Sequence, residues 1–204
     1  MKKYFLLLSM FVAGVVLLNS CSDKDDEPQL PGSVNVVEYV DATSYTDWVY
    51  FSFEKGEEVE VSDYANDLSW DIAFHRSDIR LNGGKSGKGQ GEVVNMNTTE
   101  WNDVKEAPKS GYIKDEIGII ITAFTGTGID QVEQPFSQTL TTWLTIITNP
   151  LPPTYSYNNW VFVVKTVSGK YVKLQIYDYR DARNTAAYIS FRYQYNESGS
   201  DKFE

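Results

Sequence analysis

The sequence predicts an all-β protein, built mostly of antiparallel sheets of short strands, with one helix near residues 135–147. Two observations indicate this fold class. Short runs of aromatic and β-branched residues, which favour strands, recur along the whole chain. Glycine, proline, asparagine and serine separate these runs at short intervals, as turn residues do between strands. No repeat with a period of roughly 20–50 residues is visible, so the pattern describes one domain rather than an array.

The first part of this domain carries five predicted strands. Residues 57–62 alternate strictly, with Val59 and Val61 on one face of the predicted strand. Lys55-Gly56 before them suggests a hairpin with the preceding strand. Residues 117–122 are almost continuously apolar, which predicts a buried strand. The five predicted strands are residues 34–40, 48–53, 57–62, 70–74 and 117–122.

The C-terminal third has the clearest strand pattern. Residues 160–166 and 171–179 flank the turn residues Ser168-Gly169, which predicts a hairpin. Residues 187–195 alternate again, and we expect them to pair beside the second strand of this hairpin. Three neighbouring antiparallel strands are therefore predicted here.

One segment departs from the strand pattern. Pro135 suits the first turn of a helix, and Asn149-Pro150 would end it. Between them, apolar residues fall at helical spacing, and Trp143 flanks the same face. The pattern predicts one helix over residues 135–147, packed on the sheets. The residues at helical spacing are Phe136, Leu140, Leu144 and Ile147.

Residues 1–20 are predicted to be a lipoprotein signal peptide. Lys2 and Lys3 precede an apolar run over residues 4–18, which is shorter than the ~20 residues of a membrane-spanning helix. The run ends in Leu-Asn-Ser-Cys, which resembles a bacterial lipobox. That resemblance implies that Cys21 is acylated and becomes the first residue of the mature protein. Several acyl chains, at about 0.8 kcal/mol per buried methylene, make a stable membrane anchor.

An acidic tether is predicted between Cys21 and the domain. Residues 22–27 are Ser-Asp-Lys-Asp-Asp-Glu, a composition typical of disordered, solvated chain. Its position directly after Cys21 resembles the surface-export signal of Bacteroides-type lipoproteins. Pro31-Gly32 closes the tether, so we expect residues 21–32 to be tether and residues 33–204 to be a single β domain. The predicted location is the outer membrane, exposed at the cell surface.

Composition excludes several functional classes. The formal charge is −10, and it becomes −12 when Lys2 and Lys3 leave with the leader, which argues against a nucleic-acid partner. The chain has one histidine, His75, and one cysteine, Cys21. Zinc or copper sites built from several histidine and cysteine ligands therefore cannot form, and we predict no metal site of that kind.

A further stretch of the sequence resembles a known family. Residues 70–76 read Trp-Asp-Ile-Ala-Phe-His-Arg, and Asp78-Ile79-Arg80 and Asn82-Gly83-Gly84 follow them. Together with Pro152-Pro153-Thr154-Tyr155 and Phe191-Arg192-Tyr193, these motifs resemble the HmuY family of Bacteroidetes surface lipoproteins. The resemblance covers about residues 36–195. It implies an all-β fold, a lipid anchor and, as in the best-known member, capture of haem for an outer-membrane receptor.

The resemblance also implies two axial haem ligands, either histidine or methionine, in the second half of the domain. One should lie near residues 117–128 and the other just before the Pro-Pro-x-Tyr motif. These stretches read IGIIITAFTGTG and IITNPLPP, and they contain neither ligand. Because the mature chain has only His75 and Met96, neither a pair of histidines nor a pair of methionines can form, whereas a His–Met pair or a single tyrosine remains open.

Five residues are therefore candidates for binding haem or a related tetrapyrrole. Tyr155 and Tyr157 could act as phenolate ligands or stack on a ring, and Trp143 could stack as well. Met96 lies among polar residues, where an exposed methionine at a strand end is ordinary. His75 belongs to the shared motif, and we expect a structural role for it, with its hydrogen bonds satisfied.

Two other functions remain as alternatives. Aromatic side chains also stack on sugars, so Trp101, Trp143 and Trp160 could serve a non-haem module that binds a glycan or a protein partner. A hydrolase would need two carboxylates with separated pKa values. The candidates lie in polar, turn-like contexts that predict solvated surface, so we expect a binding protein and not an enzyme. They are Asp63, Asp67, Glu100, Asp103, Asp115 and Glu116.

Overall fold

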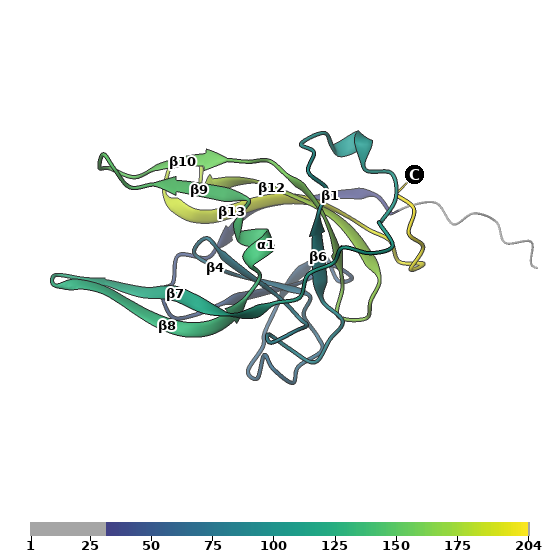
Figure 1. Ribbon diagram of the computed structural model, residues 1–204, viewed down its shortest axis with the longest axis horizontal. Coiled ribbons are helices and arrows are strands. Elements are labelled where there is room, and N and C mark those ends of the chain that lie inside the picture. Colours follow the sequence, from purple (N-terminus) through teal and green to yellow (C-terminus); the bar gives the residue numbers. More distant parts are fainter. Residues whose placement is uncertain (1–31, 204) are drawn as a thin grey trace, which may run out of the picture.

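The computed structural model describes residues 32–203, so the predicted leader, Cys21 and nearly all of the tether lie outside the described residues. The all-β fold is confirmed: antiparallel sheets make up the body of the protein (Figure 1). Within residues 32–203, no helix combines the length and apolarity that crossing a membrane would require.

The larger sheet has five strands in the order β1-β13-β12-β11-β6. The predicted hairpin of the C-terminal third forms its centre, with Val164 opposite Val172 and Lys165 opposite Tyr171. The predicted third strand pairs beside it, with Leu174 opposite Tyr193. The strand bounds are β1 (Val34–Asp41), β13 (Ala186–Tyr195), β12 (Tyr171–Arg180), β11 (Val161–Lys165) and β6 (Glu92–Asn95).

A second sheet has four strands in the order β3-β2-β4-β5. The predicted hairpin around Lys55-Gly56 joins its first two strands, with Tyr50 opposite Val59. The strands are β2 (Val49–Ser52), β3 (Glu57–Val59), β4 (Ile72–His75) and β5 (Asp78–Leu81).

The two sheets enclose one apolar core. Phe191 of β13 lies 5.4 Å from Phe51 of β2 and 5.4 Å from Phe74 of β4, measured between ring centroids. All three rings are buried, and each buried aromatic side chain removes a large apolar area from water. Below the other face of the five-stranded sheet, a smaller cluster forms around Trp101 and Phe203. Because both faces are covered, Lys173 and Gln175 are buried although they alternate with core residues.

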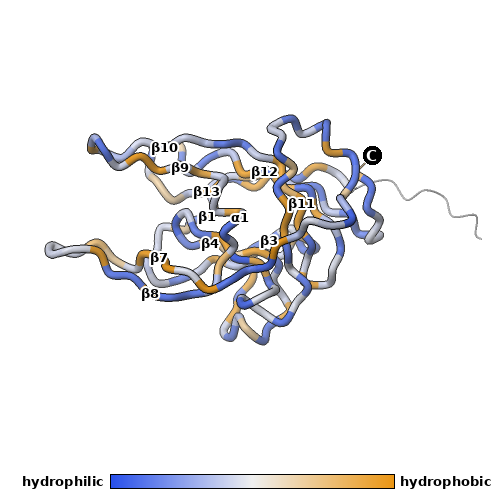
Figure 2. The backbone as a smooth tube through the Cα atoms, in the orientation of Figure 1, coloured by the Kyte–Doolittle hydropathy of each residue, from blue (hydrophilic) through white to orange (hydrophobic). Residues whose placement is uncertain are grey.

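Two hairpins project from this body as arms (Figure 1). The first arm is β7 (Glu116–Thr125) with β8 (Gly128–Phe136), and the second arm is β9 (Leu144–Ile147) with β10 (Thr154–Tyr157). Each arm is a separate two-stranded sheet. In Figure 2, apolar segments lie on β7 and β9, the strands that face each other, while much of β8 is hydrophilic.

The arms correct two predictions. The helix predicted over residues 135–147 is a single turn, α1 (Gln138–Thr141), and residues 144–147 form β9. Ser137 caps this turn by accepting a hydrogen bond from the Leu140 N–H, and Leu140, Trp143 and Leu144 are buried in the core. The strand predicted to be buried at residues 117–122 lies in the first arm, where Ile119 is 60 % exposed. The continuous run of apolar residues therefore belongs to a strand that faces the second arm, and not to a strand covered on both faces.

The Asn82 side chain links the loops that flank β4 and β5. Its amide donates hydrogen bonds to the carbonyl oxygens of Asp67 at 2.8 Å and Trp70 at 3.0 Å, and its oxygen accepts one from the Gly89 N–H at 3.2 Å. Asn82 is fully buried, and so is its hydrogen bond to the Trp70 carbonyl, so that carbonyl would lose a buried partner without Asn82.

We predict that Asn82→Ala lowers the free energy of unfolding by about 2–4 kcal/mol, because it leaves buried backbone groups without partners. Urea denaturation followed by tryptophan fluorescence measures this. Asn35→Ala is the control, since Asn35 is exposed and its amide bonds only to the nearby Ser33 carbonyl. Equal stability of the two variants would contradict the proposed role of Asn82.

Candidate ligand-binding cleft

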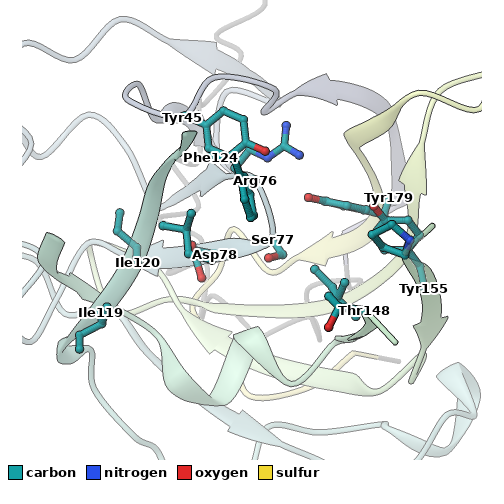
Figure 3. A pocket seen from close by; sticks show the side chains of 13 residues that line it. Tyr45, Arg76, Ser77, Asp78, Ile119, Ile120, Phe124, Thr148, Tyr155 and Tyr179 are labelled. Carbon is teal, nitrogen blue, oxygen red and sulfur yellow. The ribbon is translucent and has the colours of Figure 1, made fainter. Parts of the chain in front are cut away.

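A cleft of about 300 Å³ lies between the two arms, above the turn that joins β4 to β5 (Figure 3). The first arm supplies isoleucines and Phe124, and the second arm supplies Ile146 and Tyr155. Figure 3 shows Ile120 and Thr148 on opposite sides of the opening, with Ser77 and Asp78 between them. The lining residues are Tyr45, Arg76, Ser77, Asp78, Ile119, Ile120, Ile121, Phe124, Ile146, Thr148, Pro153, Tyr155 and Tyr179.

Arg76 places a positive charge in the floor of the cleft. It sits in the tight β4–β5 turn with φ of +53°, a left-handed conformation that few non-glycine residues adopt. Its backbone N–H donates to the Ala42 carbonyl at 2.9 Å, and its guanidinium donates to the Thr43 carbonyl at 3.1 Å. The guanidinium also lies 4.3 Å from the centre of the Tyr45 ring. These contacts hold the side chain, and no carboxylate of residues 32–203 forms an ion pair with it.

Three tyrosines form an aromatic side of the cleft. Tyr179 is almost fully buried, and its ring lies 5.1 Å from that of Tyr155. Burial raises the pKa of Tyr179 to about 12, although the nearby charge of Arg76 opposes this, so its phenol stays protonated at neutral pH. The guanidinium of Arg180 lies 4.6 Å from the centre of the Tyr155 ring. Tyr45 meets the edge of Phe124 from the first arm, with ring centroids 5.8 Å apart.

Three consecutive residues of β5 fix the first arm. The Ile79 carbonyl accepts a hydrogen bond from the Ser137 N–H at 2.7 Å. The Arg80 guanidinium donates through Nη2 to the Gln134 side-chain oxygen at 2.6 Å, and the Leu81 N–H donates to the Asp115 carboxylate at 2.7 Å. Asp115 and Ser137 stand immediately outside the two ends of the hairpin. The base of the arm is therefore held at both ends and in between.

A stack of side chains underlies this anchor, and His75 is part of it. The His75 ring stacks on Trp48 with centroids 5.1 Å apart, and the Arg80 guanidinium lies 3.4 Å from the centre of the Trp48 ring. Tyr64 lies on the far side of Arg80, at 4.4 Å. His75 is fully buried, as a structural role requires, but neither of its ring nitrogens has a hydrogen-bond partner among the described residues. Its contact with Asp78 is 3.6 Å, so the expected hydrogen bonds are not made.

The other candidate residues occupy different positions. Tyr155 lines the cleft, whereas Tyr157 stacks beside Trp143 and donates its hydroxyl to Asp178 at 3.0 Å. Trp143 is fully buried and donates to the Ser77 carbonyl at 3.2 Å, which supports the floor of the cleft from behind. Met96 is half-buried against the smaller cluster, under the opposite face of the five-stranded sheet, and not exposed.

Sequence patterns did not single out several of the lining residues. Arg76 and Asp78 were visible only as parts of the shared motif, and Tyr179 only as part of a predicted strand. Their common signal is position: each lies at the end of a strand or in a tight turn, where binding residues concentrate. Ile119 and Ile146, which are exposed, each stand in a run of neighbouring apolar residues that does not alternate with polar ones. Such a run was the sequence signal for these two positions.

One of the acidic candidates, Asp115, is buried, which corrects the expectation that it lies on the surface, and Asp71, which was not a candidate, is buried as well. Asp115 is fully buried, and burial raises the pKa of its carboxyl to about 7 against the hydrogen bonds from Ser86 and Leu81. Burial also raises the pKa of Asp71, which accepts from the Phe53 N–H at 2.8 Å and the Val167 N–H at 2.9 Å. Both carboxylates serve loops and strands, and neither lines the cleft.

Comparison with known proteins assigns the fold to a family. The profile described as HmuY protein matches residues 44–193. The chain belongs to the HmuY family. No curated protein sequence matches the chain well enough to add a closer relative.

Solved structures share the HmuY fold. The chain is 24% identical to a proposed HmuY-like haem-binding protein from Bacteroides vulgatus, with a TM-score of 0.63, covering 81% of this chain and 97% of that one. It is 24% identical to the Tannerella forsythia apo HmuY analogue, with a TM-score of 0.64 and coverages of 81% and 98%. Apo PinO from Porphyromonas gingivitis is 19% identical, with a TM-score of 0.66 and the same coverages of 81% and 98%.

The motifs that carry the HmuY resemblance have two roles in the structure, since Arg76, Asp78, Pro153 and Tyr155 line the cleft and other motif residues do not. Residues of the Trp-Asp-Ile-Ala-Phe-His-Arg motif build the second sheet and its links, as Asp71 and His75 show. The two stretches in which the resemblance placed axial ligands, residues 117–128 and 146–153, fall in the two arms that face each other across the cleft. The structure thus brings these stretches together, with isoleucine, phenylalanine, threonine and proline lining the site.

We predict that the pH dependence of stability changes in Asp115→Asn. The folded protein keeps a proton on Asp115 up to about pH 7, whereas the unfolded chain loses it near 3.8, so this carboxyl stabilises the fold at low pH and the contribution is lost as the pH rises from about 4 to 7. Relative to the wild type, the variant should gain up to about 1.4 kcal/mol per pH unit across this window. Urea denaturation at several pH values measures the difference. A difference that is constant with pH would contradict this assignment.

We also predict that Gln134→Leu loosens the first arm, because it removes the acceptor for the Arg80 guanidinium and for the Trp48 indole N–H, which lies 3.2 Å away. Amide hydrogen exchange in residues 116–136 should accelerate at least about tenfold, with β12 and β13 unchanged. Gln131→Leu makes the same change on the exposed part of β8 and should have no such effect. Gln134→Glu should retain protection, since a carboxylate accepts from both donors. Equal exchange in all variants would show that Gln134 does not anchor the arm.

Proposed function

We propose that this protein is a surface-anchored lipoprotein that binds haem or a related tetrapyrrole between its two arms and passes it to an outer-membrane receptor. One observation carries the proposal. The cleft has apolar walls from two facing hairpins and holds Arg76 and Asp78 in its floor, and it is bordered by the two stretches in which the resemblance implied axial ligands.

The walls suit the flat faces of a porphyrin. Ile119 is 60 % exposed, Ile146 40 % and Phe124 63 %, and all three line the cleft. Large exposed apolar side chains gathered at one place are typical of a ligand site. Covering them with a flat apolar ring would yield about 25 cal/mol for each Å² removed from water. Tyr155 adds an aromatic ring to the same surface.

The floor suits the carboxylates of such a ligand. Arg76 lies in the cleft, and its guanidinium is held by a backbone carbonyl and a tyrosine ring, which leaves its charge available to an anion. Arg180 lies beside Tyr155, at the edge of the same aromatic side. A ligand with carboxylates at one edge and an apolar ring would therefore be oriented, with the anionic edge toward Arg76.

The position of the cleft suits capture outside the membrane. Gly32, where the predicted tether meets the domain, accepts a hydrogen bond from Gln194 at the end of β13. The cleft lies near the other end of this strand, since Arg180, next to Tyr179, pairs with Ala186. Nine residue steps along β13 span roughly 30 Å. The cleft thus lies at the end of β13 that is far from Gly32, where the predicted tether joins the domain.

Less supports the alternative functions. Trp101 and Trp143, two of the three rings considered for glycan stacking, are buried in the cores and present no face to a sugar. A hydrolase would need two carboxylates at one site, and Asp78 is the carboxylate among the cleft-lining residues. We therefore infer binding and transfer of a ligand rather than catalysis.

Neighbouring residues of β9 allow a matched test with the soluble chain from Ser22 onward. Ile146 lines the cleft and is 40 % exposed, whereas Ile147 is 46 % exposed and does not line it. We predict saturable one-to-one binding of hemin by the wild type in an absorbance titration. Ile146→Glu should weaken binding at least about tenfold, because it places a charge against the apolar ring, and Ile147→Glu should change it less than about twofold. A flat wild-type response, or equal loss in both variants, would overturn the proposed site.

A further inference from the structure

We propose that the cleft recognises the tetrapyrrole ring and its carboxylates rather than the metal, so that metal-free porphyrins are ligands of this protein as well as haem. The inference rests on the proposed function and names its ligand class. It is carried by a mismatch within the cleft: the residues that line it suit a porphyrin ring, but they do not suit its iron.

The lining residues include no histidine, cysteine or methionine. Haem iron in proteins is held by histidine, cysteine, methionine or tyrosine side chains. The cleft is lined by isoleucine, phenylalanine, proline, serine, threonine, arginine, aspartate and tyrosine side chains. Of the four usual ligand types, only tyrosine is present, at Tyr45, Tyr155 and Tyr179.

The one histidine and the one methionine of the described residues lie elsewhere. His75 is fully buried behind the floor, stacked on Trp48, with Asp78 3.6 Å away on the side of the cleft. Met96 packs against the smaller cluster and lines a separate hollow with Val104 and Lys202. Reaching the cleft would require either residue to leave a packed position, so a His–Met pair is not available in this fold.

The three tyrosines are poorly suited to coordinate iron. A tyrosine binds iron as a phenolate, so a neighbouring group that accepts the phenol proton favours coordination. Among the described residues, no carboxylate or imidazole hydrogen-bonds to the hydroxyl of Tyr45, Tyr155 or Tyr179. The pKa of Tyr179 is raised by burial. A guanidinium near a phenol favours the phenolate by its charge, but those of Arg76 and Arg180 lie against the ring faces of Tyr45 and Tyr155, at 4.3 and 4.6 Å from their centres, and donate to the Thr43 and Asn184 carbonyls.

What remains is recognition of the organic part of the ligand. The isoleucines of the first arm and Ile146 of the second contact flat apolar faces whatever the ring holds at its centre. Arg76 contacts an anionic edge, which haem and its metal-free form share. Binding strength should therefore follow the ring and its carboxylates, and the metal should contribute little.

The test compares hemin with metal-free protoporphyrin IX, both titrated into the chain from Ser22 onward and followed by quenching of tryptophan fluorescence. We expect the two dissociation constants to agree within about threefold. Hemin binding more than about tenfold tighter than the metal-free ring would overturn the inference while leaving the proposed function intact. Failure of both ligands to bind would overturn both.

Two variants sharpen the comparison. Tyr155→Phe keeps the ring but removes the hydroxyl, and it should leave the ratio of the two dissociation constants unchanged. A ratio that changes more than about fivefold in this variant would identify Tyr155 as an iron ligand and overturn the inference. Arg76→Gln removes the charge and should weaken both ligands by the same factor, at least about threefold. Weakening of hemin alone would also contradict recognition through the shared carboxylates.

Discussion

The cleft depends on how β5 holds the first arm. A two-stranded hairpin is at best marginally stable alone, so β7 and β8 need contacts with the body to keep one position. Ile79, Arg80 and Leu81 supply them in sequence through Ser137, Gln134 and Asp115. The cost is a fully buried Arg80 whose Nε and Nη1 have no partner among the described residues. Stacking between Trp48 and Tyr64 offsets part of that cost.

The residues that carry the HmuY resemblance divide into two groups. Some link strands and loops: Asp71 bonds to Phe53 and to Val167, and thereby joins the two sheets, while Asn82 holds three loop positions. Others, such as Arg76 and Tyr155, line the cleft, whose walls come mostly from the two arms. Residues in the arms can therefore change the ligand without disturbing the fold, which explains how a member of this family keeps its architecture while the two arms hold no histidine or methionine.

The exposed apolar surface is concentrated on the arms, and it is costly to leave in water. Isoleucines at positions 117, 119 and 146 are each at least 40 % exposed, whereas the core residues of both sheets are almost completely covered. A patch of this kind on a soluble domain is typical of a binding surface. With Arg76 and Asp78 at the floor, the same surface combines apolar walls with one charge of each sign.

The amino-acid sequence alone predicts the fold class, four of the five strands of the larger sheet and the family, because alternation, turn residues and the 70–84 motifs are local signals, whereas β6 was not predicted. The stretches in which the resemblance implied ligands lie in the two arms. Only the tertiary structure decided that residues 144–147 form a strand, that residues 117–122 are an open wall, and that Asp115 is buried. Periodicity records which side chains are apolar, but not whether another segment covers them. Tyr155, Arg76 and Tyr179 come from distant parts of the chain, and only packing of the two arms and the β4–β5 turn brings them to one cleft.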